Sequence, residues 1–256
     1  MSTTTPALET RGLTIRFGGH VAVNDVSCRF TPGTLTAIVG PNGAGKTTYF
    51  NLVSGQLRAS AGQVLVSGQD ITTLSPSART RRGLGRAFQL TNLFPQLTAL
   101  ENVRLAVQSR ADAGWSLFKI WNDRRDLIEK AEAVLERVRL SDKRHVAPKA
   151  LSHGDQRKLE VALLIAMEPK VFMFDEPTAG MSVDEVPTVL ELIQDIKRRG
   201  DATVLLVEHK MDVVRSLADR IVVLHNGSLV ADGDPAEVIA SPVVQEAYLG
   251  LEATRA

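Results

Sequence analysis

Eight consecutive residues, Gly40-Pro41-Asn42-Gly43-Ala44-Gly45-Lys46-Thr47, have the types and spacing that bind a phosphate group. They match the pattern G-x-x-x-x-G-K-[ST], in which backbone N–H groups turn inward around an anion and the lysine reaches the β- and γ-phosphates. The hydroxyl of Thr47 would then ligate Mg²⁺. The alternative is a glycine-rich turn beside a chance lysine. The loop predicts nucleotide binding but does not say how the nucleotide is used.

The residues on either side of this loop favour the phosphate-binding interpretation. Leu35–Val39 is an apolar run typical of a buried parallel strand, and Thr48–Val53 continues as a helix that Gly55 ends. A helix that starts at the loop points its positive end at the bound anion. The strand, the loop and the helix together form one phosphate-binding unit.

A second group of chemically suitable residues follows another apolar strand, Val171–Phe174. Asp175 at the end of this strand provides a carboxylate for Mg²⁺, as phosphoryl-transfer enzymes with a phosphate loop require. Glu176 is the next residue and is the candidate to orient or deprotonate water. The alternative is that the two acids only end the strand. A phosphate loop elsewhere in the chain favours the catalytic interpretation.

The segment from Leu151 to Gln156 opens a helix that carries an apolar stripe. Ser152 and Asp155 have the spacing of a capping box, which predicts a well-capped helix. The same exposed helix start, with Ser152 and Gly154, also suits a second phosphate-binding surface. From this segment alone the two interpretations are equally supported.

The remaining periodicities predict an α/β chain with an inserted helical segment. Residues 8–17 and 21–30 read as two antiparallel strands joined at Gly18-Gly19, with Phe17 at the tip of the ribbon. From 97 to 168 the apolar period is helical, although 111–121 has no clear assignment. The other predicted elements are strands at 63–66 and 203–207, a helix that begins at 186 and ends in Lys-Arg-Arg-Gly200, a hairpin of 221–224 with 228–230, and two short helices that start at Asp234-Pro235 and Ser241-Pro242.

Composition excludes several classes of protein. The net charge of +1 gives no field that would attract nucleic acid, and the single Cys28 excludes an internal disulfide framework. The N-terminus has no secretory signal, and no apolar run reaches the roughly 18–20 residues of a membrane helix. We expect a cytosolic protein, and at a membrane another chain would supply the span.

The order of these motifs resembles that of the ATP-binding-cassette ATPases. The phosphate loop is followed by Phe88-Gln89, then by Leu-Ser-His-Gly-Asp-Gln, Phe-Asp-Glu-Pro-Thr and Val-Glu-His209. The resemblance covers nearly the whole chain. It implies an α/β phosphate-loop NTPase core with a mixed sheet, an N-terminal antiparallel β ribbon and an inserted α-helical subdomain. Residues 1–256 would be one nucleotide-binding domain, with the helical subdomain at 97–168 and a C-terminal hairpin and short helices at 225–256.

The resemblance also implies ATP and Mg²⁺ as cofactors and a role for each matching residue. Gln89 would contact Mg²⁺ or the attacking water, and His209 would contact the γ-phosphate of its own subunit. Ser152 and Gly154 would bind the γ-phosphate held by a second subunit, and Phe17 would stack on adenine. Taken singly, Phe17 also fits a core position, and His209 also fits a cap for a helix near Met211. The implied residues are Glu176, His209 and Gln89 for catalysis; Thr47, Gln89 and Asp175 for the metal; and Phe17, Gly40 to Thr47, Thr48, Ser152 and Gly154 for the nucleotide.

Three departures from the usual motifs narrow the resemblance. His153 and Asp155 replace a glycine and a glutamine, and Ser182 replaces an aspartate. These variants, and the ending Ser241 to Gly250, are similar to ATPase subunits of branched-chain amino acid and urea importers. The resemblance then implies a cytosolic ATPase at the inner face of the membrane that couples ATP hydrolysis to solute uptake.

Such a subunit would need several partners. The expected ones are transmembrane permease subunits that dock near Gln89–Gln96, a second identical or sister cassette, and, indirectly, a periplasmic binding protein. No nucleic acid is expected. A lipopolysaccharide-exporter ATPase, a cassette acting on ribosomes or DNA, and a phosphate-loop kinase are the alternatives. The sequence does not identify the solute, nor does it separate a homodimer from a heterodimer.

Overall fold

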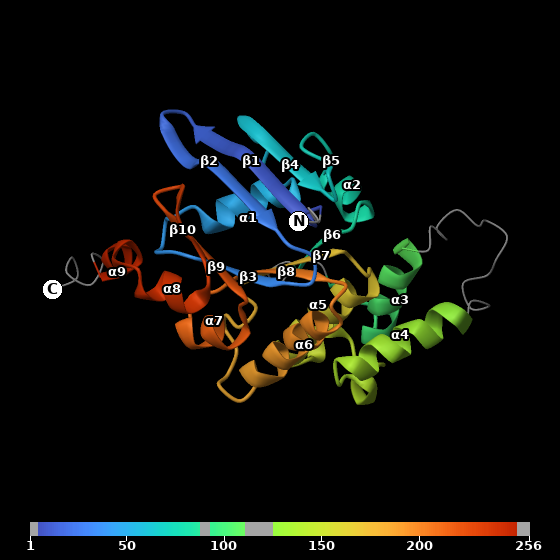
Figure 1. The fold of residues 1–256 in the computed structure, drawn as a ribbon. Coiled ribbons are helices and arrows are strands. Elements are labelled where there is room, and N and C mark those ends of the chain that lie inside the picture. Colours follow the sequence, from blue (N-terminus) through green and yellow to red (C-terminus); the bar gives the residue numbers. More distant parts are fainter. Residues whose placement is uncertain (1–4, 88–92, 111–124, 250–256) are drawn as a thin grey trace. The chain divides into compact units, whose positions relative to one another are not determined.

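The computed structural model describes residues 5–87, 93–110 and 125–249, and the chain divides into two units (Figure 1). The core unit consists of Met1–Arg86, Lys170–Glu176 and Gln194–Ala256. The helical unit consists of Ala87–Pro169 and Pro177–Ile193. The helical unit thus contains the range 97–168 and also a second segment that follows Glu176.

An antiparallel sheet forms one layer of the core unit. Its strands run in the order β2-β1-β4-β5, and β1 pairs with β2 from Leu8 opposite Phe30 to Phe17 opposite His20. The predicted ribbon is confirmed, with β2 starting one residue earlier than expected. The bounds of these strands are Leu8–Phe17 (β1), His20–Phe30 (β2), Ala61–Val66 (β4) and Gln69–Asp70 (β5).

A second sheet in the core unit has the order β10-β9-β3-β8-β7-β6. Strands β9, β3, β8 and β7 are parallel neighbours, whereas β10 is antiparallel to β9, so the sheet is mixed as predicted. Asn226 and Gly227 form the hairpin turn with φ values of 48° and 77°. The bounds are Leu35–Val39 (β3), Leu84–Ala87 (β6), Val171–Asp175 (β7), Thr203–Val207 (β8), Arg220–His225 (β9) and Ser228–Gly233 (β10).

Helix α1 (Lys46–Ser54) lies between the two sheets, as Figure 1 shows. Its Tyr49 and Phe50 are fully buried in a core shared with the apolar faces of both sheets. On the other face of the mixed sheet, Val214, Val238 and Val244 pack from three further helices. Those helices are α7 (Met211–Leu217), α8 (Pro235–Ala240) and α9 (Pro242–Leu249); α2 (Pro76–Arg81) precedes β6. This packing holds the start of α1 at the ends of the parallel strands.

Three packed helices form most of the helical unit. They are α3 (Ala99–Arg110), α4 (Arg125–Arg137) and α5 (His153–Ala166), with 3-10 turns at Ser141–Lys143 and Pro148–Ala150. Thr98 and Glu101 form a capping box before α3, because each side chain accepts from the backbone N–H of the other. Helix α6 (Val186–Arg198) crosses the boundary between the units after Ile193. Residues 111–121, which had no clear assignment, lie outside the described residues.

None of the helices in the described part of the chain is long and apolar enough to cross a membrane.

Candidate nucleotide-binding and hydrolysis site

The phosphate loop connects the end of β3 to the start of α1, as predicted. Gly45 has a φ of 95°, a conformation that other residues rarely adopt. A Cβ atom at this position would lie 2.5 Å from the Ala22 carbonyl oxygen. A glycine is therefore required here by both backbone conformation and space.

The start of α1 has backbone donors that an anion can use. Gly45 is the N-cap residue, and none of the described side chains caps this helix. The first N–H groups of a helix have no partner inside it, so they need an outside acceptor. Together with the helix dipole, these groups suit the loop to binding a phosphate.

Lys46 places a cation inside the same loop. Its side chain is buried, and Nζ donates to the carbonyl oxygens of Gly40 at 2.6 Å and Pro41 at 2.8 Å. Burial lowers the pKa of Lys46, while the negative charges of Glu176 and Asp175 raise it. Phosphate oxygens are stronger acceptors than these carbonyls because they are charged, so the ammonium is ready to exchange one for the other.

Asp175 lies at the end of β7, where the metal carboxylate was predicted. Burial raises the pKa of Asp175, and the positive charge of Arg86 opposes this. Nη2 of Arg86 donates to Oδ2 of Asp175 at 2.7 Å, and both side chains are buried. Arg86 was not identified from the sequence, because its partner Asp175 lies 89 positions further along the chain.

Glu176 and His209 contact each other directly. Nε2 of His209 lies 2.6 Å from Oε1 of Glu176, and both side chains are partly exposed. Glu176 has a φ of 49°, which is uncommon for a residue with a side chain and is typical of strained functional positions. Its N–H donates to the Val207 carbonyl at the end of β8. Lys210 is the N-cap residue of α7, so His209 does not act as the cap considered from the sequence.

Phe17 lies at the end of β1 and is 50% exposed. The alternative that it belongs to the core is therefore wrong. An exposed ring at a ribbon tip has a free face on which a base can stack.

Ser152 is the N-cap residue of α5, and its Oγ accepts from the Asp155 N–H at 3.1 Å. The reciprocal half of the predicted capping box is not formed. Instead, the Asp155 carboxylate accepts from the ammonium groups of Lys143 and Lys158. Burial raises the pKa of Asp155, but these two lysines lower it by more. The unusual aspartate at this position thus has a structural role within the helical unit.

Glu185 is a further polar residue beside the start of α5 that the sequence reading missed. Its Oε1 lies 3.3 Å from Oγ of Ser152, and a Cβ atom at Gly154 would lie 2.2 Å from the same oxygen. Ser182 donates its N–H and its hydroxyl to the other oxygen of Glu185, and these bonds lower the pKa of Glu185. Ser182, the third departure from the usual motifs, thereby orders the turn before α6.

The predicted site residues fall into three groups. The phosphate loop, Asp175, Glu176 and His209 belong to the core unit, whereas Ser152 and Gly154 belong to the helical unit. Gln89 lies outside the described residues. The core unit by itself therefore carries the phosphate loop, the Asp175 carboxylate and the contact between Glu176 and His209.

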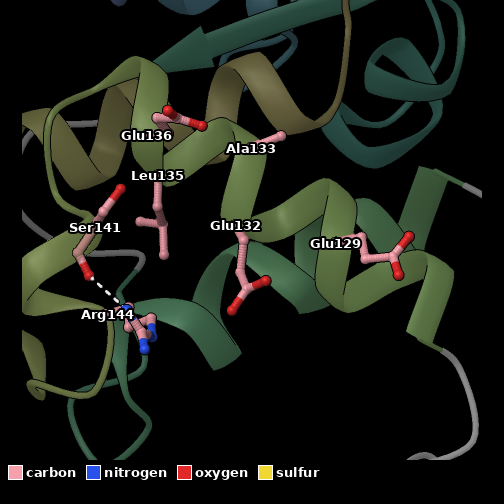
Figure 2. A pocket seen from close by; sticks show the side chains of 7 residues that line it. All are labelled: Glu129, Glu132, Ala133, Leu135, Glu136, Ser141 and Arg144. Atoms are coloured by element: carbon pink, nitrogen blue, oxygen red, sulfur yellow. Dashed lines mark hydrogen bonds between the residues drawn. The ribbon is translucent and has the colours of Figure 1, made fainter.

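A separate pocket of about 470 Å³ lies on the helical unit (Figure 2). Three glutamates of α4 line it, Glu129, Glu132 and Glu136. Ser141 and Arg144 also line it, and Nη1 of Arg144 donates to the Ser141 carbonyl oxygen. The acidic lining disfavours a phosphate ligand, because like charges repel. This pocket is not a candidate nucleotide site.

The oxygen donors of the core unit suit Mg²⁺. Asp175 offers a carboxylate, and Thr47 in the first turn of α1 offers a hydroxyl. Among the residues that the structure describes, no group of three or more His, Cys, Asp or Glu side chains could hold a metal alone. Mg²⁺ bound with a nucleotide needs few protein ligands, since phosphates and water complete its shell.

Comparison with known proteins agrees with this arrangement. A family model described as ABC transporter matches residues 23–179, and one described as Branched-chain amino acid ATP-binding cassette transporter matches residues 228–254. The high-affinity branched-chain amino acid transport ATP-binding protein BraF of Pseudomonas aeruginosa is 37% identical over 250 residues, which covers 96% of this chain and 98% of BraF. The protein of the same description named LivG, from Escherichia coli K12, is 36% identical with the same coverage.

Solved structures show the same fold. The ADP conformation of MJ1267, an ATP-binding cassette of an ABC transporter, matches with a TM-score of 0.82 and 30% identity, covering 95% of this chain and 98% of that one. A nucleotide-free cassette from an ABC transporter matches with a TM-score of 0.81 and 29% identity, covering 94% and 98%. These matches cover nearly the whole chain and agree with the phosphate loop and with the acid pair and its histidine. The chain therefore belongs to the ATP-binding-cassette transporter family and is the ATP-hydrolysing subunit of such a transporter.

Proposed function

We propose that this chain is the ATPase subunit of an importer that takes up branched-chain amino acids or a similar small polar solute. The observation that carries this proposal is the match, over 96% of the chain, to relatives described as branched-chain amino acid transport ATP-binding proteins. The match of residues 228–254 to a family model of the same description supports it independently of the ATPase motifs. Residues 1–256 then work as one cassette at the cytoplasmic face of the membrane.

In the proposed mechanism the core unit binds ATP and activates water. The phosphate loop and Lys46 hold the phosphates, and Phe17 stacks on adenine. Thr47, Asp175 and Gln89 would hold Mg²⁺, which would supply positive charge against the phosphates when bound. Glu176 orients or deprotonates the attacking water, and His209 keeps the Glu176 carboxylate in place through their 2.6 Å contact.

The second half of each ATP site comes from another cassette. Ser152 and Gly154 at the start of α5 form an anion-binding helix terminus, and we assign them to the γ-phosphate held by the partner. Two cassettes pair head to tail and enclose two ATP molecules. Closure of this pair, coupled to permease subunits, drives transport, and hydrolysis reopens it.

The Glu176→Gln variant tests this proposal. It keeps the shape of the side chain but removes the base, so ATP binds while turnover falls by about 100-fold or more. We expect light scattering to show the monomer mass without nucleotide and twice that mass with Mg-ATP. Adding Ser152→Arg to the same variant places a bulky side chain at the start of α5 and abolishes the pairing.

A Glu176→Gln chain that binds ATP but stays monomeric would contradict pairing between identical chains. Repeating the measurement with a sister cassette then separates a heterodimer from a wrong role for Ser152. Failure to bind Mg-ATP at all would overturn the assignment of the core unit.

The solute and the partners need a separate experiment. Phe94 follows residues 88–92, which the structure does not describe, and is 55% exposed. This exposed ring supports a permease contact in the region Gln89–Gln96. In vesicles that also contain the permease and the periplasmic binding protein encoded by neighbouring genes, we expect ATP-dependent uptake of labelled leucine. Uptake of urea or an amide instead, or export of lipopolysaccharide, would assign the chain to one of the alternative transporters. Co-purification with ribosomes or DNA rather than with permeases would contradict transport.

A further inference from the structure

Arg86 connects the Asp175 carboxylate to helix α1 through one buried guanidinium. Nη2 of Arg86 donates to Oδ2 of Asp175 at 2.7 Å. Nη1 donates to Oδ1 of Asn51 at 2.7 Å and to Oγ of Ser54 at 2.9 Å. The ring centroid of Phe50 lies 5.6 Å from Cζ of Arg86. Since all these residues belong to the core unit, the guanidinium is held from both sides within one body.

Two features distinguish this contact from an ion pair that serves stability alone. Arg86 binds Asp175 through Oδ2, and among the described residues no hydrogen bond is made to Oδ1, which leaves that oxygen for a cation. Two further partners of Arg86, Asn51 and Ser54, lie in the last turns of α1, the helix whose first turn carries Lys46 and Thr47. One helix thus carries the phosphate-binding groups at its start and the anchor of the metal carboxylate at its end.

We propose that Arg86 is a positioning residue for Mg²⁺, which fixes the orientation of the Asp175 carboxylate and its distance from α1. The inference rests on the role proposed above for Asp175. The planar guanidinium sets the direction of each hydrogen bond, which an ammonium at the same place does not. Arg86 also stands three residues before Gln89, so one short segment carries both the positioning residue and a predicted metal contact.

The positive charge of Arg86 also acts against metal binding, and the experiment must separate this repulsion from the positioning of Asp175. A cation beside Asp175 repels Mg²⁺, so its removal would strengthen metal binding if repulsion were the larger effect. If positioning is the larger effect, removal of Arg86 weakens metal binding, because the Asp175 carboxylate is no longer held in one orientation. The Arg86→Lys variant keeps the charge but not the planar geometry, and Arg86→Met removes both.

The measurement is the affinity for a fluorescent ATP analogue, with Mg²⁺ and with EDTA. The dissociation constant in EDTA divided by that in Mg²⁺ measures how much the metal strengthens binding, and this ratio does not depend on turnover. We expect both Arg86 variants to lower this ratio by about 10-fold or more, as loss of an outer-shell partner of a metal ligand does. The affinity in EDTA should stay close to that of the unmodified chain.

Arg79 provides the matched control. It is a buried arginine of α2 whose Nη1 donates to the carbonyl oxygens of Leu52 and Val53 at the end of α1, and none of its hydrogen bonds to the described residues reaches Asp175. We expect Arg79→Met to lower the melting temperature and to leave the metal-dependent ratio unchanged. An unchanged ratio in the Arg86 variants, or a higher ratio in Arg86→Met, would overturn the inference. A chain without substitutions that gains no affinity from Mg²⁺ would instead refute the proposed function.

Discussion

At the scale of single residues, the site combines charges that are costly to bury. Lys46 is 5% exposed, and its ammonium bonds two carbonyl oxygens of its own loop. Asp175 is 8% exposed and is compensated by Arg86. A buried charge is tolerated only when it is paired, and a ligand of opposite charge completes such a pairing. This is the physical reason for expecting Lys46 to respond strongly to phosphate.

Replacing Lys46 should therefore weaken ATP binding more than it affects folding. Hydrogen bonds to charged groups contribute about 1.5–3 kcal/mol, so Lys46→Met should raise the dissociation constant for ATP roughly 10- to 100-fold. Fluorescence titration with an ATP analogue measures this. Lys197→Met, which removes a lysine bonded to Asp219 in the same unit, is the control and should bind ATP normally. Equal affinities for both variants would be evidence against the loop as the phosphate site.

At the scale of elements, the β ribbon is stabilised by a carboxylate between two arginines. Glu9 on β1 accepts from Arg11 at 2.8 Å and from Arg29 on β2 at 2.9 Å. These contacts, with Arg11 contributing most, lower the pKa of Glu9 from 4.5 to about 2. Because Glu9 pairs directly with Arg29 across the two strands, the contact also supports the register of the ribbon.

The lowered pKa of Glu9 predicts a dependence of stability on pH. Above pH 4.5 the residue is ionised in both the folded and unfolded chain, so its contribution is fully present. As the pH falls from 4.5 towards 2, the unfolded chain binds the proton first, and the free energy of unfolding decreases. Urea unfolding at about pH 5 and about pH 3 measures the decrease, which should be smaller in Glu9→Gln. The same decrease in both proteins would assign the acid sensitivity to other carboxylates.

At the scale of the whole molecule, the two parts of the proposed ATP site belong to different units. The phosphate loop lies in the core unit and Ser152 in the helical unit. If two identical chains pair head to tail, each site takes one part from each chain. A defect in the loop and a defect at Ser152 can then complement each other when they are on different chains.

Mixing two inactive variants tests this arrangement. A pair of Lys46→Met with Ser152→Arg has one site with both defects and one intact site. Pairs of like variants contain no intact site, so ATPase activity recovers only through mixed pairs, to about a quarter of the original value if pairing is random and to about half if only mixed pairs form. Each variant alone should stay inactive. No recovery on mixing would contradict an active pair of identical chains and would favour a sister cassette as the partner.

Periodicity in the sequence was enough to predict most of the fold. Strand β3 has the predicted bounds, and the hairpin at Asn226-Gly227 forms where the turn signal placed it. Local patterns succeed in these cases because a buried strand or a tight turn depends on neighbouring residues. Of the capping box predicted for Ser152 and Asp155, only the bond from the Asp155 N–H to Oγ of Ser152 forms. The Asp155 carboxylate instead accepts from Lys143, nine residues before Ser152. Such a contact depends on packing that local sequence does not reveal.

The sequence by itself determined the chemistry of this protein: the order of the phosphate loop, the serine-glycine segment and the acid pair identified an ATP-binding-cassette ATPase. Local spacing can do this because each motif places its own backbone and side chains. Only the tertiary structure decided how the charges are paired. Arg86 reaches Asp175 across 89 positions of sequence, and His209 reaches Glu176 across 33. These contacts arise because neighbouring strands of the mixed sheet bring distant residues to one edge.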